Sequence, residues 1–199
     1  MTTAAVTWPR TTDRLVLRPA RAADIDALLA FRNRTEVQRW LINTVAEPEE
    51  FRRDWLASVD DPHDHSCVVE LDGQVIGICY LELNNGLRQP GGPERQVGQI
   101  GYIFAPEVAG HGYATEAAAE ILVIAFEELQ LHRVEAGCFA DNLASVRVLE
   151  KIGMRREQHG IQDSWHAELG WIDGYTYAML GSEWPAARRG VARVTPGQP

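Results

Sequence analysis

The chain has 199 residues, of which 45% are hydrophobic and 24% are charged, an ordinary composition for a globular protein. Its length suits one domain with a sizeable core. The formal net charge of −9 disfavours a nucleic-acid-binding module, because an acidic surface repels phosphates. The same surface attracts cations, including protonated amines.

Apolar runs and cysteines indicate the compartment. The longest strongly apolar run, residues 121–126, is far too short to span a bilayer, and residues 1–10 contain no apolar signal core. The three cysteines, Cys67, Cys79 and Cys138, are odd in number, and their spacing matches no zinc site. We therefore predict a cytoplasmic protein with free thiols, no metal site and no membrane segment.

The first half of the chain predicts one strand, three helices and a hairpin. The strand covers residues 13–18, and helical periodicity predicts helices over 23–32, 37–41 and 48–58. Two β-rich runs, 66–71 and 74–83, are joined by Asp72-Gly73, a typical hairpin turn.

The second half predicts alternating strands and helices after a loop over residues 84–96. Strands are expected over 97–104, 133–139 and 171–180, with another strand starting at 154–156, and helices over 115–129 and 142–152. The order indicates a mixed α/β (α+β) fold, a single twisted and mostly antiparallel sheet of about seven strands with helices on both faces. Residues 185–199 are rich in Pro, Gly and Arg and are predicted to be a disordered tail, which leaves one domain over 1–184.

A glycine turn follows the strand predicted over residues 97–104. It contains Gly110 and Gly112, and a helix opens near Ala114. Glycines allow close approach of a ligand to the backbone, and a helix start offers unpaired N–H groups and a positive dipole end. Together these features suit a pyrophosphate. The alternative is a strand-to-helix turn without a ligand, because the P-loop Lys-Ser/Thr and the third glycine of a dinucleotide fingerprint are both missing.

Four segments resemble one family. Residues 110–114, Gly-His-Gly-Tyr-Ala, resemble the pyrophosphate loop of the GNAT superfamily of N-acetyltransferases, Gln/Arg-x-x-Gly-x-Gly/Ala, although Ala109 stands where Gln or Arg is usual. Residues 141–154 resemble that family's Asn-x-x-Ser helix, which ends in Glu-Lys-x-Gly-Met. Residues 12–19 and 171–184 resemble the opening and closing strands of the branch that includes the ribosomal-protein-alanine N-acetyltransferases.

The resemblance implies the GNAT acyl-CoA acyltransferase fold and acetyl-CoA as cosubstrate. It implies direct transfer of the acetyl group, in a ternary complex, to a primary amine of a protein N-terminus or of a small molecule. Relatives often form homodimers. The strand over 97–104 should splay from its neighbour and admit the pantetheine arm, and Ser145 should protonate the departing thiolate. The residues expected to bind the coenzyme are Ile103, Phe104, Ala105, Gly110, His111, Gly112, Tyr113, Ala114, Thr115, Asn142 and Ser145.

The general base and the amine pocket stay open at this stage. Gln99 stands where many relatives have a catalytic Glu, so the base must come from elsewhere, unless direct attack needs no strong base. The pocket walls are sought in residues 32–41, 84–96 and 165–171, with Trp40 and Trp171 as candidates. The candidate bases are Glu82, Asp163, Glu168, Asp173, His159 and His166.

Two other functions compete with the enzyme. Ala109 and Gln99 favour a non-catalytic module that binds or senses acetyl-CoA. A purely structural domain with a chance glycine turn is the third possibility.

Overall fold

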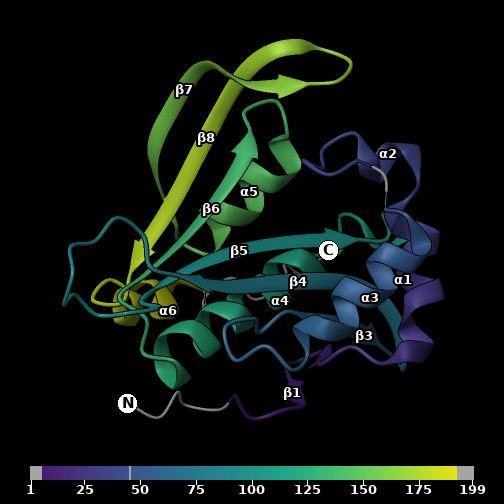
Figure 1. The fold of residues 1–199 in the computed structure, drawn as a ribbon, viewed down its shortest axis with the longest axis horizontal. Helices are drawn as coiled ribbons and strands as arrows, with labels where there is room; N and C mark the ends of the chain where they lie inside the picture. The colour runs from purple at the N-terminus through teal and green to yellow at the C-terminus, as the bar shows by residue number, and fades with distance from the viewer. Residues whose placement is uncertain (1–5, 45, 192–199) are drawn as a thin grey trace.

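A single sheet of eight strands organises the molecule in the order β1-β2-β3-β4-β5-β6-β8-β7. We describe residues 6–44 and 46–191 of a computed structural model (Figure 1). Only the β5–β6 pair is parallel, so the predicted single, mostly antiparallel sheet is confirmed. The strands are β1 (Arg10–Thr11), β2 (Val16–Arg18), β3 (Cys67–Leu71), β4 (Gln74–Asn84), β5 (Val97–Phe104), β6 (Arg133–Phe139), β7 (Arg155–His166) and β8 (Gly170–Leu180).

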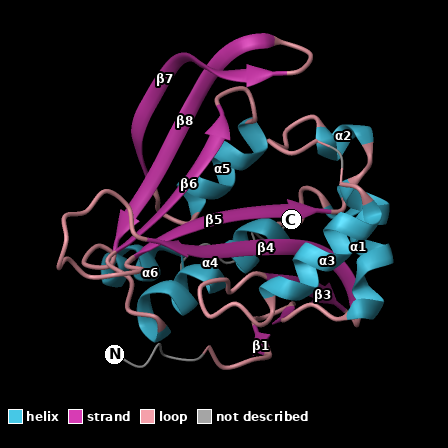
Figure 2. Cartoon of the chain, viewed as in Figure 1, coloured by secondary structure: helices cyan, strands magenta, loops and turns pink. Residues whose placement is uncertain are grey.

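Helices cover both faces of the sheet, as predicted (Figure 2). None of the helices in the described ranges is long and apolar enough to cross a membrane. The helices are α1 (Ile25–Arg32) after a 3-10 turn η1 (Ala22–Asp24), α2 (Thr35–Gln38), α3 (Pro48–Ser58), a 3-10 turn η2 (Pro106–Val108), α4 (Tyr113–Val123) continuing into a π-helical turn η3 (Ile124–Glu128), α5 (Leu143–Lys151) and α6 (Trp184–Val191).

Two apolar clusters separate the faces of the sheet. On one face, α4 packs its buried Ala118 and Leu122 against Leu81 and Ile100 of the central strands. On the other face, α1 and α3 pack against Ile78 and neighbouring residues of the same strands. Alternate residues of a strand point to opposite faces, so β4 and β5 contribute to both clusters.

The sheet opens between β5 and β6. These strands pair only from Val97 to Gln99 with Arg133 to Glu135, although β5 continues to Phe104 and β6 continues to Phe139. β6 pairs with β8 along its whole length instead, and the V-shaped divergence is visible in Figure 1. The predicted splay of the strand over 97–104 is therefore present.

A buried ion-pair network ties the opening strand to the first helix. Arg18 donates to both carboxylate oxygens of Asp24, at 2.7 and 2.8 Å, and also pairs with Glu70 of β3. The bond from Arg18 lowers the pKa of Asp24, although burial opposes the shift. This bidentate contact fixes the start of α1 relative to the sheet.

Two differences from the sequence prediction concern the end of the chain. Residues 185–191 lie in α6 rather than in a disordered tail, because Trp184 is buried against Phe126, with ring centroids 5.6 Å apart. Residues 192–199 lie outside the described part. The strand expected from 154–156 extends to His166 and forms a long hairpin with β8. The eighth strand is the two-residue β1.

Candidate coenzyme and acceptor sites

The glycine turn before α4 has the conformation that its sequence predicts. Gly110 and Gly112 both have φ of 82°, and Gly112 is the left-handed N-cap residue of α4. The first turn closes with a 3.0 Å bond from the Glu116 amide to the Gly112 carbonyl. The amides of Tyr113, Ala114 and Thr115 come earlier in the helix than the Glu116 amide. In the first turn of a helix, such N–H groups have no carbonyl acceptor within the helix. The turn therefore offers amides to an anion.

Arg14 brings a positive charge to this turn. Its guanidinium donates to the carbonyl of His111 at 2.9 Å and lies 4.4 Å from the centroid of the Tyr113 ring. It also pairs with Glu116 at 2.7 Å, which offsets part of the charge. Arg14 thus brings a guanidinium to the turn in which Ala109 replaces the usual Gln or Arg.

His111 folds back onto its own turn. Its Nδ1 lies 3.0 Å from the carbonyl oxygen of Ala109, and its ring stacks on Tyr113 at 5.8 Å between centroids. Nδ1 is therefore engaged locally, and only Nε2 could face a phosphate.

The opening between β5 and β6 exposes backbone groups of alternate residues. The Ala105 amide donates to Ile76 of β4 at 2.9 Å, and by the alternation of an antiparallel ladder Ile103 also faces β4. The backbone groups of Phe104 and Tyr102 point the other way, into the opening. Of the three residues predicted on this strand, Phe104 is thus the one that offers its backbone to a pantetheine arm.

Ser145 lies on α5 at the mouth of the same opening. The Asn142 side chain accepts a bond from the Ser145 amide at 3.2 Å, so Asn142 is the N-cap of α5. The hydroxyl of Tyr102 lies 3.0 Å from Ser145 Oγ and 3.1 Å from the Ser145 carbonyl oxygen. Ser145 and Tyr102 therefore join α5 to β5 across the gap.

Burial keeps the groups around Ser145 protonated. Burial raises the pKa of Tyr102 well above its ordinary value, and the bond to Ser145 only partly offsets this effect. Burial also raises the pKa of Cys138, which is hydrogen-bonded to Ser145. The cluster can hold a proton at an oxygen near the opening.

A row of polar side chains crosses the opposite face of the sheet. Glu82 of β4 is paired in register with Gln99 of β5 and, on its other side, forms a bridge with Asp64. Partial burial, with a smaller contribution from Asp64, raises the pKa of Glu82. Among the candidate bases, Glu82 is the one placed directly beside Gln99.

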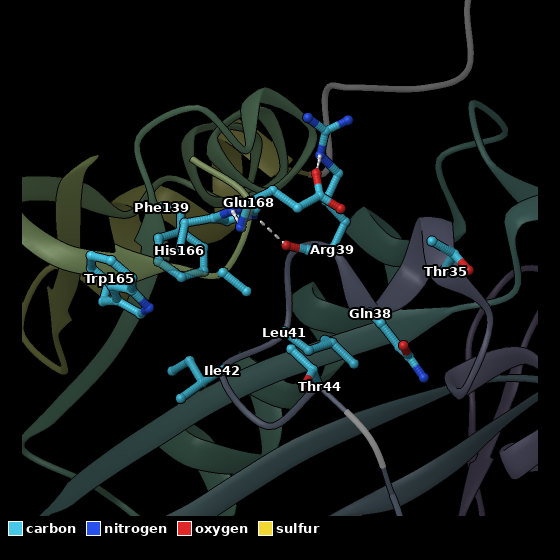
Figure 3. Close-up of a pocket in the computed structure, with 11 residues that line it drawn as sticks. Thr35, Gln38, Arg39, Leu41, Ile42, Thr44, Phe139, Trp165, His166 and Glu168 are labelled. Carbon is cyan, nitrogen blue, oxygen red and sulfur yellow. Dashed lines mark hydrogen bonds and ion pairs between the residues drawn. The ribbon is translucent and has the colours of Figure 1, made fainter. Parts of the chain in front are cut away.

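Two of the three predicted pocket walls come together in a first pocket of about 430 Å³ (Figure 3). The segment around α2 forms one side and the tip of the β7–β8 hairpin forms the other. The loop 84–96 lines neither of the two pockets described here. The two predicted tryptophans are not among the lining residues: Trp40 packs on Phe139 and His166, and Trp171 packs edge-on against Trp165.

The first pocket is lined by Thr35, Gln38, Arg39, Leu41, Ile42, Thr44, Phe139, Trp165, His166, Ala167 and Glu168.

His166 is a structural clamp rather than a base. Its Nδ1 accepts bonds from the amides of Glu168 and Leu169 at 3.1 and 3.2 Å. Its Nε2 must then carry the proton that it donates to the Arg39 carbonyl at 2.7 Å (Figure 3). Both ring nitrogens are occupied, so the side chain holds the hairpin tip against α2.

The other candidate bases are engaged on the hairpin. His159 Nε2 lies 2.6 Å from Asp173, and the contact, after a backbone bond from Gln162, lowers the pKa of Asp173. Glu168 pairs with Arg39 at 3.4 Å, and Asp163 accepts a bond from Ser164. None of these groups is adjacent in register to Gln99.

A second pocket, of about 720 Å³, lies over β4 beneath α1 and α3. It shares Ile42 and Thr44 with the first pocket and reaches Glu82 and Tyr80 on the sheet. The face of the sheet opposite α4 therefore has a hollow that reaches Glu82. It is lined by Arg32, Ile42, Asn43, Thr44, Ala46, Glu47, Glu50, Phe51, Asp54, Trp55, Ser58, Asp64, Tyr80 and Glu82.

Two contributors to these sites were not predicted from the sequence. Arg14 lies in the opening-strand motif and Tyr102 in the Gly-Tyr that follows Gln99, but neither was given a role, whereas Arg32 is the first residue of the predicted wall 32–41 and lines the second pocket. Their partners lie 43 residues away for Tyr102 and 97 residues away for Arg14, so no local pattern reveals them.

Known proteins share this architecture. A crystal structure described as an acetyltransferase of the GNAT family from Bacillus anthracis superposes with a TM-score of 0.72 at 30% identity, covering 87% of this chain and 98% of that one. RimJ from Mycobacterium smegmatis, solved in complex with CoA-disulfide, gives 0.74 at 27% identity, with 89% and 88% covered. The uncharacterized N-acetyltransferase YnaD of Bacillus subtilis (strain 168) is 44% identical over 86 residues, which are 43% of this chain and half of that relative's length.

The opened sheet and these matches define the class as acetyltransferases built on one mixed sheet. Residues 14–155 match the acetyltransferase (GNAT) domain family. The chain belongs to the GNAT acetyltransferase family, whose members use acetyl-CoA, and the family and enzyme class predicted from the sequence are confirmed.

Proposed function

We propose that the protein transfers the acetyl group of acetyl-CoA directly to a primary amine, of a protein N-terminus or of a small molecule, in a ternary complex. The observation that carries this proposal is the opening between β5 and β6, with the amides of α4 at one side and Ser145 at the other. Coenzyme and amine would meet at this opening from opposite faces of the sheet.

The residues around the opening fit the coenzyme. The amides of Tyr113, Ala114 and Thr115, together with Arg14, suit a pyrophosphate, because they place N–H donors and positive charge at one helix start. The backbone of Phe104 can pair with the pantetheine amides as an added strand would. When bound, acetyl-CoA supplies the acetyl group as a thioester.

Ser145 would hold the proton that the leaving sulfur needs. Its Oγ lies 3.0 Å from the hydroxyl of Tyr102. Because burial keeps Tyr102 protonated, its hydroxyl can donate to Ser145 Oγ as that oxygen gives up its proton. Tyr102 therefore acts as a positioning residue for Ser145.

Replacing Tyr102 with phenylalanine should lower kcat about 10-fold and leave the Kd for CoA within about 3-fold. The aromatic ring stays in place, while the bond to Ser145 is lost. Steady-state kinetics and calorimetry measure the two quantities. Tyr177→Phe is the matched control, because its hydroxyl donates to Glu150 on the same helix and does not touch Ser145. An equal loss in both variants would reduce Tyr102 to a packing role.

Glu82 is the base that the register favours. It stands across from Gln99, at the point where the second pocket reaches the sheet. Its raised pKa favours proton uptake compared with an ordinary carboxylate. The carboxylate form is needed for this role and is lost as the pH falls through the raised pKa.

Replacing Glu82 with glutamine should lower kcat/KM about 10²-fold at neutral pH. It should also abolish the fall in kcat/KM at acid pH that results from protonation of the Glu82 carboxylate. The pH profile of kcat/KM measures both effects. The double variant Glu82→Gln/Gln99→Glu moves the carboxylate to the neighbouring strand and should restore part of the activity. An unchanged acid limb in Glu82→Gln would remove Glu82 from proton transfer.

Turnover separates the enzyme from a module that only binds acetyl-CoA. Thiol release from acetyl-CoA should depend on an added amine in a broad panel. CoA binding by calorimetry without turnover in any panel would support the module.

The cytoplasmic location, the homodimer and the lack of nucleic-acid binding stay predictions. The oligomeric state can be measured by sedimentation.

A further inference from the structure

Arg32 is a buried cation with unused donors. Its side chain is 93% buried at the end of α1, where it lines the second pocket. Nη2 donates to the carbonyl of Asn43 at 2.9 Å, and the guanidinium also has a side-chain hydrogen bond with Tyr80. Nε and Nη1 have no further partner, and no carboxylate pairs with Arg32, within the described ranges. A buried guanidinium without an anion is costly, so this arrangement points to an anionic group that enters the pocket.

Trp55 adds a second unused donor beside it. The indole is 6% exposed, and its Nε1 has no acceptor among the described residues. Phe51 stacks on Trp55 with centroids 5.8 Å apart and lies under the Arg32 guanidinium at 5.6 Å. This apolar setting strengthens a bond from either donor to an anion.

The rest of the pocket is acidic. Glu50 and Asp54 are offset by Arg53, whereas Glu47, Asp64 and Glu82 have no ion-pair partner within residues 6–44 and 46–191. A simple anion would meet these carboxylates, and a simple amine would leave Arg32 unpaired. A ligand that carries both charges satisfies both parts of the pocket.

We propose that the acceptor is a primary amine bearing a carboxylate, of the free amino acid class, whose carboxylate is bound by Arg32 and Trp55 while its amine faces Asp64 and Glu82. This inference rests on the proposed function and narrows it to one substrate class. Tyr80, which contacts Arg32, and Glu82 are two residues apart on one face of β4, so the Arg32 end and the Glu82 end of the pocket lie along a single strand.

Matched pairs of ligands test the proposal. The probes are the free L-amino acids and their carboxamides, which keep the α-amine and lose the carboxylate and therefore also imitate a protein N-terminus. Binding is measured by thermal shift with CoA present, and turnover is measured by thiol release from acetyl-CoA. We expect at least one amino acid to bind, and to react with a kcat/KM at least 30-fold above that of its carboxamide. Carboxamides that bind and react as well as the acids would overturn the proposal and favour a protein N-terminus.

Arg32→Met provides the variant arm. It should lower the affinity for the amino acid at least 30-fold, bring the ratio of acid to amide near one, and leave the Kd for CoA unchanged. The variant should fold, because an apolar side chain replaces a buried charge without an ion-pair partner. Arg52→Met is the control, since Arg52 lies on the same helix α3, pairs with Asp26 and does not line the pocket. An acid preference that survives in Arg32→Met would refute the assignment.

The two measurements separate the inference from the proposed function. Amino acids that bind in an Arg32-dependent way without any thiol release would support the pocket and contradict the transferase. Thiol release with amines that lack a carboxylate, without binding of any amino acid, would support the transferase and contradict the pocket.

Discussion

Replacing Ser145 with alanine is expected to lower kcat about 10²-fold, with the Kd for CoA within about 3-fold of the wild-type value. The change removes the proton donor at the opening. The fold should persist, because the Tyr102 hydroxyl keeps the Ser145 carbonyl as acceptor at 3.1 Å and Asn142 still caps the Ser145 amide. Single-turnover rates and calorimetry measure the two quantities.

Ser182→Ala is the matched control for this variant, because Ser182 is an exposed serine in the turn before α6. It should have wild-type kcat. A Ser145→Ala enzyme as fast as the wild type would remove Ser145 from the reaction. A loss confined to CoA affinity would make it a binding residue instead.

Replacing Gly112 with valine is expected to weaken CoA binding about 10- to 100-fold. A β-branched residue is strained at φ of 82°, and its Cβ would lie 3.6 Å from Nη2 of Arg14. Relief of the strain must move the first turn of α4, and with it the amides proposed to bind the pyrophosphate. Isothermal titration with CoA measures the change.

Gly73→Val controls for backbone strain. Gly73 has φ of 78° in the turn between β3 and β4, where an added Cβ meets no atom within 4 Å. It should lose stability in a melting experiment while binding CoA normally. If folded Gly112→Val keeps the wild-type affinity, the pyrophosphate lies elsewhere.

The central elements were predictable because their patterns are local. The helix α3 and the strands β5 and β6 have the bounds expected from the sequence, since their apolar patterns are clear and Pro48 and Pro106 mark the start of α3 and the end of β5. The start of α4 was misplaced by only two residues, at Tyr113 rather than 115, because Gly112 in the left-handed conformation ends the turn.

The hairpin and the last helix were harder to predict for physical reasons. β7 is mostly exposed and polar and carries two register irregularities, so it shows no alternation of apolar residues beyond its start. α6 depends on Trp184, whose indole donates to Glu127 on η3 at 2.8 Å. Such a contact, across 57 residues, leaves no signal in a Pro- and Gly-rich segment.

The site was predictable where the family motif fixes it and not where tertiary contacts build it. Gly112 and Ser145 follow from the resemblance, but the choice of Glu82 among six candidate bases needed the register of β4 with β5. Arg32 shows its importance only through burial without an anionic partner.

The short pairing of β5 with β6 has a consequence for the release of products from the proposed site. Three residues of each strand pair there, and beyond them β5 and β6 diverge without further pairing. Free CoA could depart past α4 while the acetylated product leaves past α1 and α3. On the proposed function, we therefore expect neither product to block the release of the other.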